Sequence, residues 1–173
     1  MRAIAKLLVL SACLGLAAPA WAAHTLSLAE QRVLSSWLAK HPKYRLATDS
    51  DCNCADDIKQ MKSGYGGNWK PVADYHPYVA TGDFNSDGVE DFAVAVIDRT
   101  KQKDNFVLIV FNGPSLPTTE LRPAFLKSGL DLSGQGLFYG PPRPKPYRLV
   151  IGSFESEGWV LVPNGHGYKL SGS

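Results

Sequence analysis

The 173-residue sequence lacks the usual signatures of a catalytic site. It has no His-Glu-x-x-His zinc pattern, no Gly-x-Ser-x-Gly nucleophile elbow, no phosphate-binding loop and no dinucleotide-binding fingerprint. Its histidines are scattered at His24, His41, His76 and His166. We therefore assign no catalytic residue from the sequence.

Cysteine is also scarce, with three residues at Cys13, Cys52 and Cys54. Two neighbouring thiols are too few for a structural zinc site. If Cys13 is removed with an export signal, Cys52 and Cys54 can pair only with each other in an oxidising compartment. We expect this disulfide to be a local staple. The alternative is a redox-active pair, because a bridge across one residue closes a very small loop.

Long apolar runs are confined to the start of the chain. Arg2 and Lys6 precede an apolar stretch over 7–18 and a small-x-small cleavage site ending at Ala22, which predicts an export signal. The apolar stretch is too short to span a membrane. Cys13 and the three residues before it resemble a bacterial lipobox. We expect a periplasmic or secreted protein, with a lipoprotein anchored through Cys13 as the alternative.

The chain has no large excess of charge, since 18 Lys and Arg face 16 Asp and Glu. Removing residues 1–22 also removes Arg2 and Lys6, so the two signs then balance. This predicts neither a nucleic acid nor an anionic membrane as partner. The remaining residues 23–173 are enough for one domain with its own core.

The sequence does contain a dense run of oxygen-bearing side chains that ends at Asp91. Carboxylates this close together repel one another unless a cation lies among them. Calcium accepts six to eight oxygens with tolerant geometry, whereas magnesium requires a stricter octahedron. Gly88 lets the backbone turn sharply. The expected ligands are Asp83, Asn85, Asp87, the backbone carbonyl of Val89, and Asp91. The alternative is an Asp- and Asn-rich hairpin turn without metal.

Residues 82–94 resemble the calcium loop of FG-GAP/VCBS-type repeats, in which Gly-Asp-Phe-Asn-x-Asp-Gly-x-x-Asp precedes an apolar strand. The loop begins like an EF-hand, but Val94 stands where an EF-hand has its bidentate glutamate. The resemblance implies a calcium loop of the kind found in many exported bacterial proteins. It does not imply a propeller, because the motif occurs once and a propeller needs several blades.

Helical patterning precedes this loop, and strand patterning follows it. A capping box at Ser27 and Glu30 predicts a helix that ends at His41, and a second helix is expected over 55–62. The apolar period of two predicts strands near 78–84, 91–98, 105–111, 136–139, 147–154, 158–162 and 168–170. A brief helix is expected around 124–126. The predicted fold class is α+β, with N-terminal helices packed on a mainly antiparallel sheet and the calcium loop in one β-hairpin.

Aromatic residues around the glycine-rich stretch 64–71 suggest a binding surface. Trp69 and Tyr75 are candidate partner contacts; alternatively, they fold down over the sheet edge. The predicted function is a non-catalytic calcium-binding module that binds an envelope protein or a glycan, in one form as an inhibitor or immunity-type partner. The alternative is a calcium-dependent hydrolase acting near Asp83, Asp91 and His76.

Overall fold

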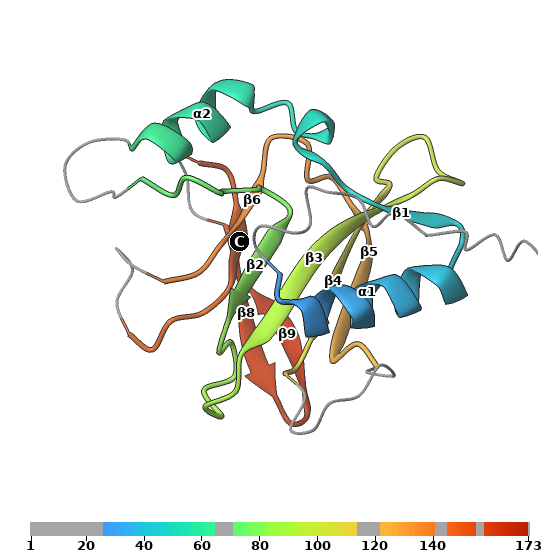
Figure 1. The fold of residues 1–173 in the computed structure, drawn as a ribbon, viewed down its shortest axis with the longest axis vertical. Coiled ribbons are helices and arrows are strands. Elements are labelled where there is room, and N and C mark those ends of the chain that lie inside the picture. The colour runs from blue at the N-terminus through green and yellow to red at the C-terminus, as the bar shows by residue number, and fades with distance from the viewer. Residues whose placement is uncertain (1–25, 65–70, 114–121, 141–144, 155–157, 173) are drawn as a thin grey trace, which may run out of the picture.

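A computed structural model describes residues 26–64, 71–113, 122–140, 145–154 and 158–172. It contains helices α1 (Leu28–Lys40) and α2 (Ala55–Ser63) and a short 3-10 helix, η2 (Asp49–Asp51) (Figure 1). The strands are β1 (Tyr44–Leu46), β2 (Val79–Gly82), β3 (Asp91–Asp98), β4 (Phe106–Phe111), β5 (Phe125–Leu130), β6 (Gly136–Phe138), β7 (Val150–Gly152), β8 (Trp159–Asn164) and β9 (Gly167–Ser171).

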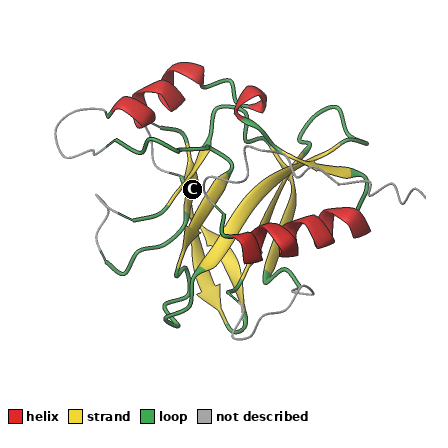
Figure 2. Cartoon of the chain, in the orientation of Figure 1, coloured by secondary structure: helices red, strands yellow, loops and turns green. Residues whose placement is uncertain are grey.

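The strands form two antiparallel sheets, where the sequence predicted one. The first sheet has the order β1-β3-β4-β5, and β2 pairs with the part of β3 that β1 leaves free. The second sheet has the order β6-β7-β8-β9. The chain leaves the first sheet at an Asx turn, where the Ser133 N–H donates to Asp131 Oδ1 at 3.0 Å. The fold is therefore α+β with a predominance of strands (Figure 2).

Strands β3 and β4 are buried on both faces and form the centre of the molecule. Phe92, Val94 and Val96 face α1, where they meet Val33 and Trp37. The alternate side chains of both strands contribute to a second core, which they share with α2 and the second sheet. The period-two alternation in the sequence thus serves two hydrophobic interfaces, one on each side of the same strands.

The two helices predicted before the acidic loop are confirmed. Ser27 and Glu30 form the expected capping box at α1: the Glu30 N–H donates to Ser27 Oγ at 3.3 Å, and the Ser27 N–H donates to Glu30 Oε2 at 2.6 Å. Helix α2 ends at Gly64, which has a φ of 92°. No helix among the described residues has the length and apolar content needed to cross a membrane.

The helix predicted around 124–126 is wrong. Phe125 and Leu126 begin β5, which pairs with β4 from Val110↔Phe125 to Phe106↔Leu130. The edge of β4 supplies hydrogen-bond partners for this backbone, and that pairing overrides the weak local helical pattern. Strand β1 and helix η2 were not predicted at all.

Candidate metal site

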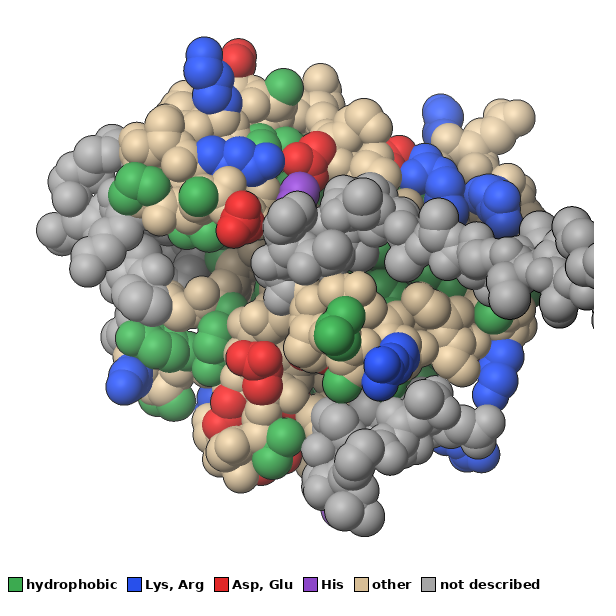
Figure 3. Space-filling model, in the orientation of Figure 1, with side chains coloured by type: hydrophobic (Ala, Val, Ile, Leu, Met, Phe, Trp, Pro, Cys, Tyr) green, Lys and Arg blue, Asp and Glu red, His purple; other side chains and the backbone are tan. Residues whose placement is uncertain are grey.

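The acidic loop lies where the sequence predicted it, in the hairpin between β2 and β3. Gly82 pairs with Asp91, so residues 83–90 form the connection at one end of the first sheet (Figure 1). Asp87 and Glu90 are exposed, whereas Asp83 is half-buried. In Figure 3, Asp and Glu side chains gather at the lower left, over this end of the hairpin.

Backbone N–H groups order the side-chain oxygens of the loop. The Asp87 N–H donates to Asp83 Oδ1 at 3.0 Å and to Asn85 Oδ1 at 2.9 Å. The Gly88 N–H donates to Asp83 Oδ2 at 2.9 Å, and the Val89 N–H donates to Asp87 Oδ1 at 2.8 Å. Gly88 has a φ of 87°, so it supplies the left-handed turn for which a glycine was expected. The loop backbone thus wraps around its own acidic side chains.

Asp91 differs from the other acidic residues of the loop because it is fully buried. Its Oδ1 accepts the Gly113 N–H at 2.8 Å, and its Oδ2 accepts the Phe84 N–H at 2.9 Å and the Tyr168 hydroxyl at 2.9 Å. Burial raises the pKa of Asp91, and the charge of Asp87 adds to this, while the three hydrogen bonds oppose it. No ion pair within the described parts of the chain neutralises this carboxylate.

The second sheet holds the loop in place. The Tyr139 hydroxyl donates to the Asp83 carbonyl oxygen at 2.9 Å, and a Cβ on Gly82 would overlap the Tyr139 ring. Arg148 Nη1 donates to Ser86 Oγ at 2.9 Å, so this guanidinium reaches a hydroxyl of the loop. Burial raises the pKa of both Tyr139 and Tyr168, and the neighbouring carboxylates raise them further.

The donor set of this loop fits a hard cation. The predicted side-chain ligands are all carboxylate or amide oxygens, which calcium prefers. The two carboxylate oxygens of Asp83 each accept one N–H, as does Asn85 Oδ1, so lone pairs are left over on all three atoms. In the described residues, no three His, Cys, Asp or Glu side chains converge as a metal site requires. Bound calcium would therefore have to draw these oxygens together and recruit the Val89 carbonyl.

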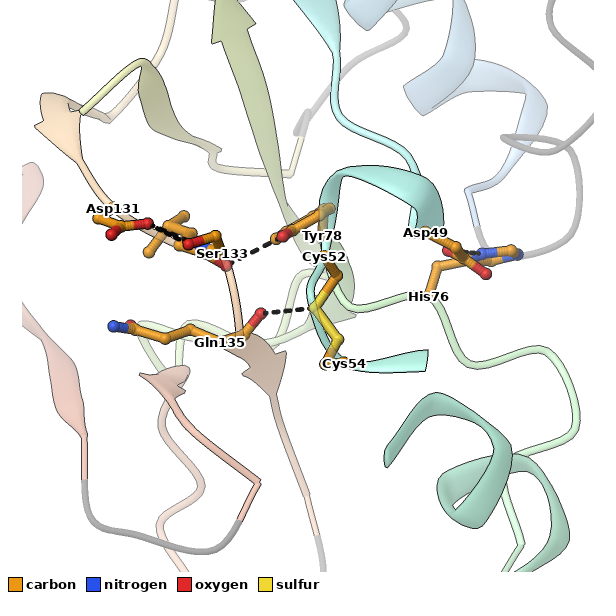
Figure 4. Close-up of a disulfide and its surroundings, with 9 residues drawn as sticks. Asp49, Cys52, Cys54, His76, Tyr78, Asp131, Ser133 and Gln135 are labelled. Carbon is orange, nitrogen blue, oxygen red and sulfur yellow. Dashed lines mark hydrogen bonds and ion pairs between the residues drawn. A yellow bond between two sulfur atoms is a disulfide. The ribbon is translucent and has the colours of Figure 1, made fainter. Parts of the chain in front are cut away.

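His76 does not lie at the loop. Its Nδ1 lies 2.8 Å from Asp49 Oδ1, and Figure 4 shows the two side chains together beside η2. His76 precedes β2 and the loop follows it, so the four-residue strand alone separates them by roughly 13 Å. The hydrolase alternative required a base beside Asp83 and Asp91, and the structure does not bring His76 there.

Cys52 and Cys54 form a disulfide between η2 and α2, with a Cα–Cα distance of 5.1 Å (Figure 4). Both residues are buried, with 7% and 4% of their surface exposed. Cys52 Sγ lies 3.8 Å from the Gln135 carbonyl oxygen, so the disulfide packs against the chain just before β6. Burial favours the staple over the redox-active alternative, because thiol exchange requires access to a sulfur.

Tyr75, a predicted partner contact, does not lie on an exposed surface. Tyr75 is buried and packs against Phe138 and Phe154, whose ring centroids both lie 6.0 Å from its own. This position agrees with the alternative that the aromatic residue folds down over the sheet, because it extends the core between the first and second sheets. Trp69, the other candidate, lies outside the described residues, as do the predicted signal over 1–22 and Cys13.

Sequence reasoning missed three residues that build this site: Gly113, Tyr139 and Tyr168. Each lies far from the loop in sequence, and Tyr168 is separated from Asp91 by 77 positions. No local spacing relates such residues to the loop. The chain matches no protein-family model, no curated protein and no solved structure. The functional argument therefore rests on the residues themselves.

Proposed function

We propose that the chain is an exported, calcium-braced binding module without catalytic activity. In this proposal, calcium binds the loop through Asp83, Asn85, Asp87, the Val89 carbonyl and Asp91. The ordered loop then holds a surface that binds an envelope protein or a glycan, and one form of such a module is an inhibitor or immunity-type partner of an envelope enzyme.

The observation that carries the calcium proposal is the buried Asp91 carboxylate. A buried carboxylate without a counter-charge destabilises a folded protein, and three hydrogen bonds offset only part of that cost. Asp83, Asn85 and Asp87 place further oxygens in the same short loop. A divalent cation would offset most of the negative charge of the three aspartates, of which Asp91 alone is fully buried.

The position of the loop favours a structural role for the ion. Tyr139 contacts the loop at the Asp83 carbonyl oxygen and Tyr168 contacts Asp91 directly after it, so an ion bound there would stabilise the junction of the two sheets. An ion enclosed by protein oxygens has few positions left for a substrate. Export is supported by the Cys52–Cys54 disulfide, which is typical of oxidising compartments.

Calcium titration of residues 23–173 tests this proposal. We expect a dissociation constant of about 0.1–1 mM, so 1 mM calcium should raise the melting temperature by about 1–5 °C. Asp87→Ala should abolish the heat of binding and the calcium-dependent shift, because it removes a charged ligand.

Glu90→Gln is the matched control, because Glu90 is an exposed acid of the same loop that is not an expected ligand. It should retain calcium binding within about threefold, since an exposed charge contributes little. Wild-type protein without any heat of binding or thermal shift in millimolar calcium would refute the site. If Asp87→Ala and Glu90→Gln lost calcium affinity to the same extent, calcium would be attracted non-specifically to the acidic loop.

A further inference from the structure

We infer that Tyr168 is a positioning residue of the proposed calcium site, which couples ion binding at the β2–β3 loop to the docking of the second sheet. This inference rests on the proposed function, because it concerns the orientation of a predicted ligand. It adds a residue that belongs to neither the loop nor the calcium motif.

The first step of the argument is the location of the Tyr168 hydroxyl. Tyr168 belongs to β9 of the second sheet, whereas Asp91 begins β3 of the first. Both side chains are buried, and the hydroxyl lies 2.9 Å from Asp91 Oδ2. The bond therefore crosses the interface between the two sheets, inside the core that they share.

The second step concerns the single proton of that hydroxyl. Its oxygen also lies 2.8 Å from Asn112 Oδ1, so two acceptor atoms compete for one proton. The ionised carboxylate of Asp91 is the stronger acceptor and should receive it. Rotation of the Asn112 amide by half a turn would present an N–H group to the phenol oxygen and satisfy the second contact.

The third step is the arrangement of donors around Asp91. The Gly113 N–H holds Oδ1, while the Phe84 N–H and Tyr168 share Oδ2. These donors come from three segments of the chain, and together they fix the plane of the carboxylate. At most one lone pair of the group, on Oδ1, remains for a metal. Groups that orient a metal ligand in this way typically change metal affinity by 10–100-fold when removed.

Coupling between the ion and the sheets follows from these contacts. If Tyr168 fixes the ligand, calcium binding must in return favour the docked position of β9, because linkage is reciprocal. The same loop is tied to the second sheet a second time, through Tyr139 and the Asp83 carbonyl oxygen. The ion would therefore stabilise the interface between the sheets as well as the hairpin.

Tyr168→Phe tests the inference, because it removes one hydroxyl and leaves the ring in the core. We expect calcium to bind this variant about tenfold more weakly in calorimetry, with a smaller calcium-dependent rise in melting temperature. Tyr78→Phe is the matched control. Tyr78 is also buried in the core between the sheets, and its hydroxyl donates to the Leu132 carbonyl oxygen at 2.9 Å. It should lower stability without calcium but leave calcium affinity within about twofold of wild type.

Hydrogen exchange of the wild-type protein provides a second test that needs no substitution. Calcium should slow exchange at the Leu137 amide, whose hydrogen bond to the Pro77 carbonyl oxygen links the two sheets, more than at the Ala47 amide, whose hydrogen bond to the Ala95 carbonyl oxygen lies within the first sheet. Unchanged affinity in Tyr168→Phe, or equal weakening in Tyr78→Phe, would overturn the inference and leave the calcium site standing. Equal slowing at both amides would also overturn it. Absence of calcium binding by the wild-type protein would overturn both proposals.

Discussion

Two aspartates of this chain show how partners decide the behaviour of a carboxylate. Asp51 accepts hydrogen bonds from Arg45 Nη2 at 2.6 Å and Nη1 at 2.8 Å, and from the Thr48 N–H at 2.7 Å. The guanidinium lowers the pKa of Asp51 to about 2. Burial instead raises the pKa of Asp91, which has no cationic partner among the described residues. Of the two, Asp91 is the one that a bound cation would stabilise.

Asp51→Asn should lower the free energy of unfolding by about 1 kcal/mol at pH 7, since the pair is partly exposed to solvent. The folded pKa of Asp51 lies below its ordinary value of 3.8. Its stabilising contribution is therefore complete above about pH 4 and is lost as the pH falls towards 2. The difference between variant and wild type, followed by circular dichroism during thermal unfolding, should shrink over this range.

The exposed Asp104 provides the control, because Asp104→Asn removes a carboxylate that makes no ion pair in the described structure. It should have little effect at any pH. A gap between Asp51→Asn and wild type that stays constant from pH 7 to pH 2 would contradict the assigned role of Arg45.

At the scale of elements, the β2–β3 hairpin depends on close packing as well as on charge. Gly82 ends β2 with a φ of 153°, and the ring of Tyr139 lies directly against its Cα. This approach allows the Tyr139 hydroxyl to reach the Asp83 carbonyl oxygen. The glycine before the acidic motif thus has a role in packing, and the motif by itself does not reveal it.

Gly82→Ala should displace the Tyr139 ring and lower the free energy of unfolding by about 1–3 kcal/mol. Because the loop loses a tether, calcium affinity should fall as well. Gly129→Ala is the control: Gly129 has a φ of 75°, and a Cβ there would meet nothing within 4 Å. Gly129→Ala should lower the free energy of unfolding by about 1–2 kcal/mol, because alanine disfavours this backbone conformation, and it should leave calcium affinity unchanged. Urea titrations with and without calcium measure both quantities. Equal effects of the two substitutions on affinity would contradict the packing argument.

At the scale of the molecule, α1, the first sheet and the second sheet form three successive layers, and β3 and β4 are the central strands of the middle layer. The near balance of charge in the sequence still leaves the two ends of β3 with loops of different charge. The acidic loop precedes β3, while Arg99, Lys101 and Lys103 lie in the exposed turn that follows it. In Figure 3, Lys and Arg side chains lie at the upper right, over β1 and this turn, and also at the upper left. The two ends of the molecule therefore present different surfaces to a partner.

Affinity capture tests whether a partner exists. Immobilised residues 23–173 should retain one envelope protein or glycan in stoichiometric amount when calcium is present. A chelator should release this partner, because bound calcium orders the loop that holds the binding surface. Asp87→Ala should capture less, whereas Glu90→Gln should capture as much as wild type. Turnover of a glycan or ester substrate by the purified protein, lost in His76→Ala, would contradict the non-catalytic assignment and favour the hydrolase alternative.

The sequence by itself determined what short-range spacing controls. The capping box of Ser27 and Glu30, the apolar face of α1 and the alternation of β3 and β4 each follow from residues close together in the chain. The same holds for the position of the acidic loop in a hairpin. These features were predictable because the local backbone geometry sets which neighbouring side chains share a face.

Only the tertiary structure decided how distant segments meet. The division into two sheets, the burial of Tyr75 and the pairing of His76 with Asp49 all depend on contacts that no local pattern encodes. The clearest example is the 77-residue separation between Asp91 and Tyr168. Side chains this far apart meet because both elements bury apolar surface in one core, and that packing determines which polar atoms come within hydrogen-bonding distance.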